Sequence, residues 1–361
     1  MADGQSSAFR FEGRWQDYAP IAFTNLLLTI LTLGVYRFWA STRSRRYLWG
    51  HTQFIDEPLE WAGTPIELLI GFALAALLFG LPFLFLQFGV QALALQGHPG
   101  MAGLLGFAAF LFLVYLAGVA RFRTLRYRLS RTFWHGIRGG SDAQGLAYGL
   151  SWFWKSAAAV VTAYLLVPWS MMSLWNERWR QMSFGSHHFR SEGRATPIYP
   201  LFLLFYLAPV LFVIAVVAVG FAVVGAFFNF DLKQSSGAIA AIVIVAIILA
   251  VAGIYIVLGL FALVFYAAFL REAIGHLSLG DVDFQFDATT KDWLKLIFGD
   301  IGLVLVTLGI GMIFLEYRHW KFFITHLEAT GEVSLSSLGQ STTRTPSQGE
   351  GLFDAFDIGA I

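Results

Sequence analysis

Seven long runs of apolar residues, almost free of charge, limit what this chain can fold into. A helix needs about 20 mostly apolar residues to cross the roughly 30 Å hydrocarbon core of a bilayer. With 57% apolar and 13% charged residues, the chain carries more hydrocarbon than one soluble core can bury, so the excess is expected to face lipid. The runs cover approximately residues 19–39, 66–95, 101–120, 151–175, 198–228, 238–270 and 293–315.

The arginines conflict with a simple alternation of seven crossings. Basic residues gather just after the first, third, fourth and last runs, and the positive-inside rule assigns such loops to the cytoplasm. A single crossing by residues 151–175 would put two arginine-rich loops, 121–138 and 178–194, on opposite sides. Two alternatives stay open. Either one loop of seven plain spans violates the rule, or three runs are re-entrant and break at Thr32-Leu33-Gly34, Val167-Pro168-Trp169 and Thr307-Leu308-Gly309.

We therefore predict an all-α polytopic membrane protein with about seven membrane segments, namely two helical hairpins and three spanning or re-entrant segments. Aromatic and polar residues alternate with period two near Phe9, Leu59 and Val282, which indicates short strands paired in a small cytoplasmic β-layer. Residues 1–18 would hold an N-terminal cytoplasmic strand, 19–330 the membrane domain, and 331–361 a flexible tail with a docking peptide at 351–358.

The ends of the membrane domain resemble each other. Residues 9–51 align with residues 284–326 without a gap, and the alignment pairs glycine, arginine and histidine positions as well as apolar ones. It places Thr32 on Thr307, Arg43 on Arg318 and His51 on His326. A weaker copy lies near residues 144–189. The pattern predicts a membrane domain built from internal repeats.

The segment before and around the first run carries a family resemblance. Its residues are Phe11-Glu12-Gly13, the run Leu31 to Trp39 (LTLGVYRFW), Arg45-Arg46-Tyr47 and His51-Thr52. These motifs resemble the YjgN-type family of bacterial inner-membrane proteins, a domain of unknown function, over about residues 9–330. The resemblance implies a multi-pass protein of the cell inner membrane and supplies no catalytic residue.

Polar side chains inside the apolar runs are the first candidates for a functional site. Polar residues such as Asn25 and Thr32 lie at matching depth, and Asn25, Thr29, Thr32 and Thr307 could line a polar path. We place the carboxylates Glu67 and Glu272 at segment ends, so a proton-driven pump is not expected.

Arginines and histidines at the helix ends are the second set of candidates. Arg43, Arg45, Arg46, Arg178 and Arg318 could contact lipid headgroups, although setting the topology is favoured because it explains their positions without any ligand. His51 and His326 are weak metal candidates, because neither HExxH nor paired carboxylates accompany them. We therefore predict neither a metal nor a cofactor.

Two functions from different classes remain. The first is a transporter or channel-like protein for an unknown small solute, suggested by the repeats and the broken runs. The second is a non-transporting scaffold or lipid-organising protein with a basic cytoplasmic face. Without a nucleophile motif or a phosphate-binding loop, we do not expect an enzyme. Membrane lipids are the expected partners and nucleic acid is not; a homo-oligomer and a cytoplasmic partner bound by the tail are both left open.

Overall fold

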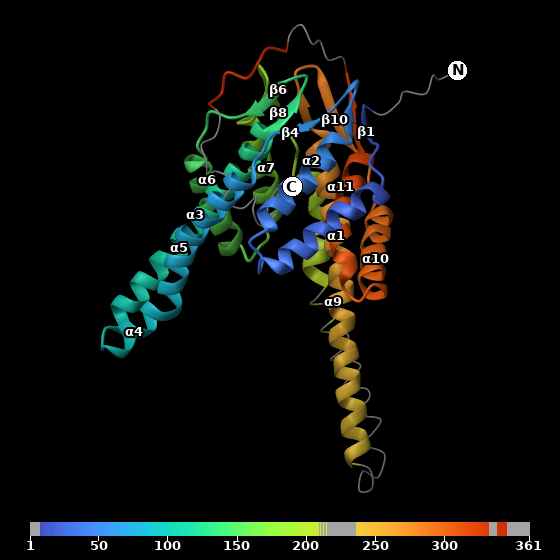
Figure 1. Cartoon of the computed structure of the whole chain (residues 1–361). Helices are drawn as coiled ribbons and strands as arrows, with labels where there is room; N and C mark the ends of the chain where they lie inside the picture. The colour runs from blue at the N-terminus through green and yellow to red at the C-terminus, as the bar shows by residue number, and fades with distance from the viewer. Residues whose placement is uncertain are drawn as a thin grey trace.

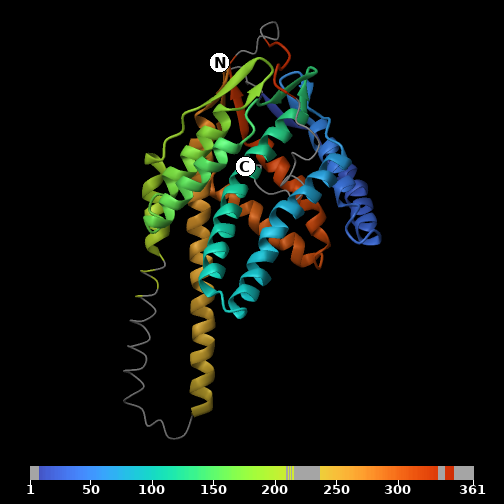
Figure 2. The ribbon, with the colours of Figure 1, turned by 90° about the vertical axis from the view of Figure 1, so that its left-hand side faces the viewer.

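The computed structural model describes residues 8–208, 210, 212, 214, 236–331 and 338–344. Its strands gather at one end of the molecule and its longest helices project from the other (Figure 1). A view turned by 90° keeps this division, with α9 (Ser236–Gly275) reaching farthest from the strands (Figure 2). The molecule is therefore polarised into a strand-rich end and an apolar helical end.

Two antiparallel sheets form the strand-rich end. One has eight strands in the order β11-β10-β9-β8-β7-β6-β5-β4, and the other has three in the order β1-β2-β3. Only Leu59 separates β3 from β4, and β1 contacts β11, so the sheets curl toward each other at both junctions. The strands are β1 (Phe9–Phe11), β2 (Thr52–Phe54), β3 (Glu57–Pro58), β4 (Glu60–Trp61), β5 (Thr132–Trp134), β6 (Ile137–Gly140), β7 (Ser183–Phe184), β8 (His187–Ser191), β9 (Leu277–Leu279), β10 (Val282–Phe286) and β11 (Leu327–Thr330).

Three helical stretches of the described chain are long and apolar enough to cross a membrane: Pro65–Leu95, Pro99–Arg131 and Ala252–Gly275. The first comprises α3 (Pro65–Leu84), a π-helical turn (Phe85–Gly89) and α4 (Val90–Leu95); the second is α5, and the third belongs to α9. Thr64 and Glu67 start α3 with a capping box, and Pro65 fills its first position.

Three pairs of shorter helices, one before, one between and one after the long helices, each turn the chain back on itself. The strands that flank each pair, β1 and β2, β6 and β7, or β10 and β11, bond to each other. The pairs are α1 (Trp15–Leu31) with α2 (Arg37–Gly50), α6 (Leu146–Val161) with α7 (Val167–Arg180), and α10 (Thr290–Val306) with a 3-10 turn (Ile310–Phe314) and α11 (Leu315–Thr325).

The same threonine-centred turn joins the helices in each pair. The hydroxyl of Thr32, Thr162 or Thr307 donates to the carbonyl four residues earlier and accepts the backbone N–H four residues later. The next two residues have positive φ, which is 52° and 93° at Leu33 and Gly34. Glycine adopts this conformation without a Cβ penalty, and a helix cannot continue through it.

Removing one of these hydroxyls should test how much the turn contributes to stability. The Thr307 hydroxyl donates to Leu303 O at 2.6 Å and accepts from Gly311 N at 2.7 Å. Thr307→Val, which keeps the shape, is expected to lower the free energy of unfolding by about 1 kcal/mol. Thr325→Val removes an exposed hydroxyl that donates to Lys321 O at 2.8 Å and accepts no backbone N–H from the described residues, so it should cost less in the same thermal unfolding experiment in detergent. Equal losses for the two variants would contradict this role of the turn.

The predicted all-α fold with about seven membrane segments is wrong. The structure contains an eight-stranded sheet, and among the described residues three helices, rather than seven, have the length and composition to span. The first, fourth and last apolar runs are each split into two shorter helices. Hydropathy counts apolar residues along the chain, and a reversal within the run leaves that count unchanged.

One predicted break was also misplaced. Val167-Pro168-Trp169 forms the first turn of α7, where proline at an early helical position is favoured. The chain reverses before it, through Thr162, Ala163 (φ 49°) and Tyr164 (φ 67°). Glycine is absent from this turn, so the sequence pattern of the two other turns did not reveal it.

Candidate functional site

A cavity of about 990 Å³ lies between the sheets and the helices, and we call it the chamber. Its walls come from α2, α5, α7, α9, α10 and α11 and from most of the strands. This volume is at the upper end of the range for small-molecule sites, which is about 300–1,000 Å³. The chamber is therefore large enough for a sizeable ligand.

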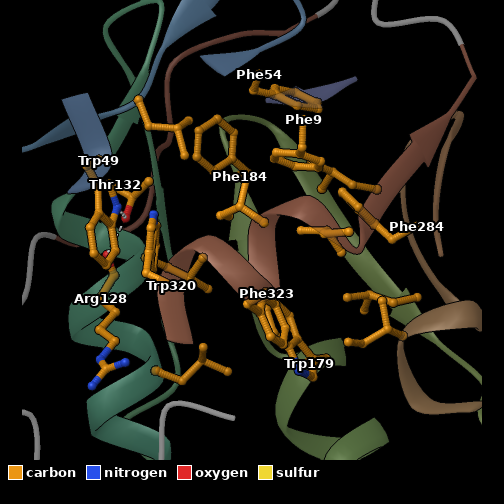
Figure 3. A pocket seen from close by; sticks show the side chains of 18 of the residues that line it. Phe9, Trp49, Phe54, Arg128, Thr132, Trp179, Phe184, Phe284, Trp320 and Phe323 are labelled. Carbon is orange, nitrogen blue, oxygen red and sulfur yellow. Dashed lines mark hydrogen bonds between the residues drawn. The ribbon is translucent and has the colours of Figure 1, made fainter. Parts of the chain in front are cut away.

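Aromatic side chains line the side of the chamber nearest the strands (Figure 3). The rings of Phe9 and Phe54 stack with centroids 4.5 Å apart, and Trp134 meets Phe54 edge-on at 4.9 Å. Phe284 lies 6.3 Å from Phe9 and 6.4 Å from Phe189. Because these rings belong to strands of both sheets, the aromatic cluster joins the two sheets across the chamber wall.

Two stacked tryptophans form a second part of the wall, with their ring centroids 4.0 Å apart. The indole N–H of Trp49 donates to the Thr132 hydroxyl and that of Trp320 to the Thr52 hydroxyl, each at 2.9 Å. Thr132 directly follows α5, Thr52 follows α2 after His51, and each hydroxyl donates in turn to a carbonyl of the preceding helix, Arg128 O and Leu48 O. The polar edges of the indoles are thus satisfied inside the protein, and the surface offered to a ligand is mainly hydrocarbon.

Charged side chains border this apolar wall. Arg45, Arg128, Asp281 and Glu316 all contribute to the chamber lining, and the Arg45 guanidinium lies 5.2 Å from the centroid of the Trp61 ring. Such a site suits an amphipathic molecule, because its apolar part can contact the rings while its polar part meets the charges.

The residues predicted to form a polar path lie outside the chamber lining. The Asn25 amide donates to Ala40 O at 3.2 Å and to the Ser44 hydroxyl at 3.4 Å, which links α1 to α2. The hydroxyls of Thr32 and Thr307 are engaged in the helix turns, and the Thr29 carbonyl accepts the N–H of Gly34. Their role as a path stays a prediction, whereas their structural contacts are explicit.

A carboxylate inside the last apolar run was overlooked in the sequence. Asp300 of α10 pairs with Arg318 at 2.5 Å and with His319 at 2.7 Å. In the α6/α7 pair, Lys155 binds Glu177 at 2.6 Å. Asn25, Lys155 and Asp300 each lie two helical turns before the threonine of their own helix pair, on the same face of the helix as that threonine. Each helix pair therefore carries a polar link between its two helices.

The five candidate arginines divide by environment. Arg43 and Arg46 are exposed, Arg318 is half-buried in its ion pair, and Arg45 and Arg178 are buried. The Arg178 guanidinium lies 5.5 Å from the Trp175 ring centroid, and burial lowers the pKa of Arg178 from its ordinary value. Arg43 and Arg46 are thus accessible to headgroups, whereas Arg45 and Arg178 are held inside the protein.

The two candidate histidines are the C-cap residues of α2 and α11. The Nδ1 atoms of His51 and His326 lie 2.7 Å and 2.8 Å from the carbonyl oxygens of Tyr47 and Phe322, to which they donate as Nδ1–H. Within the described part of the chain, no group of three or more histidine, aspartate or glutamate side chains is arranged to hold a metal ion.

Comparison with known proteins decides the family. Residues 6–355 match the family described as "Bacterial protein of unknown function (DUF898)". The chain belongs to this family. Its similarity to the inner membrane protein YjgN of Salmonella typhimurium is 27% identity over 138 residues, which is 38% of this chain and 32% of that protein. YjgN of Escherichia coli strain K12 is 27% identical over 136 residues, covering 38% and 31%.

These matches confirm the YjgN-type resemblance and the inner-membrane location of this DUF898 member. Each match spans about a third of the length of the curated relative. No solved structure matches the chain significantly.

Proposed function

We propose that this DUF898 protein is a multi-pass carrier that takes up an amphipathic small molecule and transfers it within or across the inner membrane. The aromatic chamber carries this proposal, because its size and hydrocarbon wall fit an apolar ligand portion and its charged border fits a polar one. The proposal assigns the protein no chemical step, because the wall offers contact surface rather than a nucleophile beside a base.

The orientation follows from the positive-inside rule. Arginines lie in the second half of α2 and in the last turns of α5 and α7, toward the strand-rich end, so we infer a cytoplasmic position for the sheets. The tips of two helix pairs expose Leu33 by 94% and Leu308 by 93%, and such exposed apolar side chains support contact of the tips with lipid. The chamber would then lie between the cytoplasmic sheets and the membrane helices, where an amphipathic ligand partitions.

Flux into vesicles tests the carrier proposal. The purified protein is reconstituted into liposomes that contain a phospholipid with a nitrobenzoxadiazole fluorophore, and dithionite added outside quenches only the outer leaflet. We expect the protected fraction to fall below the half that protein-free vesicles retain, because labelled lipid exchanges between leaflets. Small inorganic ions, which lack an apolar part, should not cross. The carrier proposal fails if neither labelled phospholipid nor labelled fatty acid moves faster than in empty vesicles.

A lipid-organising scaffold is the second candidate, and the exposure of Arg43 and Arg46 favours it. Each basic residue near an anionic surface contributes about 1 kcal/mol to lipid attraction. The scaffold function predicts that Arg43→Gln with Arg46→Gln reduces enrichment of anionic lipid around the protein, with no dependence on the chamber. If the same variant moves labelled lipid at an unchanged rate, the arginines act in lipid attraction and not in transport through the chamber.

A further inference from the structure

Residues 338–344 lie against the rim of the eight-stranded sheet, and we call this segment the strap. The Gly339 N–H donates to the Ser186 hydroxyl at 3.1 Å, in the turn between β7 and β8. The Gln340 side-chain amide donates to Gly136 O at 2.9 Å, in the turn between β5 and β6. Two hairpin turns of the sheet are therefore connected by one piece of chain from far along the sequence.

Arg138 of β6 holds the strap at two further points. Its backbone N–H donates to the Gln340 side-chain oxygen at 3.3 Å, and its guanidinium donates to the Thr343 carbonyl. The side chains of Ser341 and Thr343 bond to each other at 2.8 Å and are exposed by only 8% and 7%. Such burial of small polar side chains requires close contact with the sheet.

The strap also reaches the chamber, because Leu338 contributes to its lining together with Phe184 and Gly280. The fit beside it is tight. A Cβ placed on Gly185 would come within 2.6 Å of Gly339 O and 3.1 Å of a Leu338 methyl. The strap therefore covers part of the chamber wall at the end formed by the hairpin turns.

We propose that the strap is a lid that closes the chamber toward the cytoplasm, and that its release admits or discharges the ligand. Apart from Leu338 the strap is polar, with the sequence GQSTTR, so hydrogen bonds rather than apolar burial hold it in place. Each such bond contributes modestly to stability, so the strap can open while the sheet stays folded. The role of the lid in ligand passage rests on the proposed carrier function, whereas its closing of the chamber is independent of that function.

Gly140 offers a way to displace the strap without changing the strap itself. A Cβ on Gly140 would collide with the Thr343 hydroxyl oxygen, whereas the Thr343 Cβ would remain at 3.4 Å. Gly140→Ala should therefore push the strap away, and adding Thr343→Ala should relieve the collision. Comparing the single with the double variant distinguishes displacement of the strap, which Thr343→Ala should reverse, from a general loss of structure, which it should not.

Access to the chamber can be measured with a single cysteine, because the natural chain has none. Leu279→Cys places a thiol in the chamber lining, and a water-soluble maleimide reports its accessibility in the detergent-solubilised protein. We expect Gly140→Ala, and truncation after residue 337, to speed labelling roughly tenfold, because the bonds to the strap are lost. The double variant Gly140→Ala/Thr343→Ala should return toward the slow rate.

Lys295→Cys, at a charged surface position with a side chain 78% exposed and outside the chamber lining, serves as the reference and should label equally in all backgrounds. Equal labelling of Leu279→Cys with and without Gly140→Ala, while the reference is unchanged, overturns the lid. If truncation alters the reference, the point variants decide. If the variants label faster but the protein moves no lipid, the lid proposal stands and the carrier proposal fails. If the protein moves lipid but labelling is unchanged in the variants, the carrier proposal stands and the lid proposal fails.

Discussion

Replacing Arg131 by methionine is expected to lower the free energy of unfolding by about 3 kcal/mol. The Arg131 guanidinium donates to both carboxylate oxygens of Glu67, at 2.8 Å and 3.0 Å, and both side chains are largely buried. The Tyr127 hydroxyl donates to the same carboxylate at 3.0 Å. Removing the arginine leaves a buried negative charge with weaker compensation, which is the costly way to break such a pair.

The loss should be large because this ion pair joins several elements. It links the start of α3 to the end of α5, and the Arg131 carbonyl accepts the Ala62 N–H beside the β4/β5 pairing. Lys295→Met is the matched control, since Lys295 pairs with Asp292 on an exposed surface and should cost under about 0.5 kcal/mol. Thermal unfolding in detergent would measure both variants. A difference of less than about 0.5 kcal/mol between Arg131→Met and the natural protein would contradict the assigned role of this pair.

The fold was predictable where local chemistry determines it. Alternation near Phe9 and Val282 identified two strands that the structure contains, and the threonine and glycine of Thr32-Leu33-Gly34 marked a helix end. Register and strand order were not predictable, because paired neighbours such as β8 and β9 lie far apart in the sequence. The sequence predicted a small β-layer, whereas the structure contains a three-stranded and an eight-stranded sheet.

The candidate site was less accessible to sequence reasoning. Polar residues inside apolar runs were the predicted site, yet Asn25 links the two helices of one pair and Thr307 stabilises the turn of another. The chamber is instead built from aromatic residues that any membrane protein carries in number, so composition alone does not distinguish them. A usable signal was a threonine within two residues of a helix end, as at Thr52 and Thr132, because the hydroxyl of each accepts the indole N–H of a tryptophan of the wall.

Blocking the chamber should have the largest effect on transport. Leu296 of α10 lines the chamber, and Leu296→Cys would accept a sulfonate-bearing methanethiosulfonate reagent as a mixed disulfide. The added group occupies ligand space and places a charge beside hydrocarbon. Each ligand methylene excluded from an apolar wall loses about 0.8 kcal/mol, so two exceed a factor of ten in affinity. Labelled-lipid flux is therefore expected to fall about tenfold or more.

Leu305→Cys supplies the matched control, because it lies on the same helix with a side chain 69% exposed and away from the chamber lining. Mass spectrometry would confirm complete modification of both variants before the vesicle assay. Dithiothreitol should then restore flux through Leu296→Cys, which excludes misfolding as the cause of the loss. If the fully modified Leu296→Cys protein moves labelled lipid as fast as the unmodified one, the ligand does not pass through the chamber, since a charge fixed in its apolar wall cannot leave binding there unchanged.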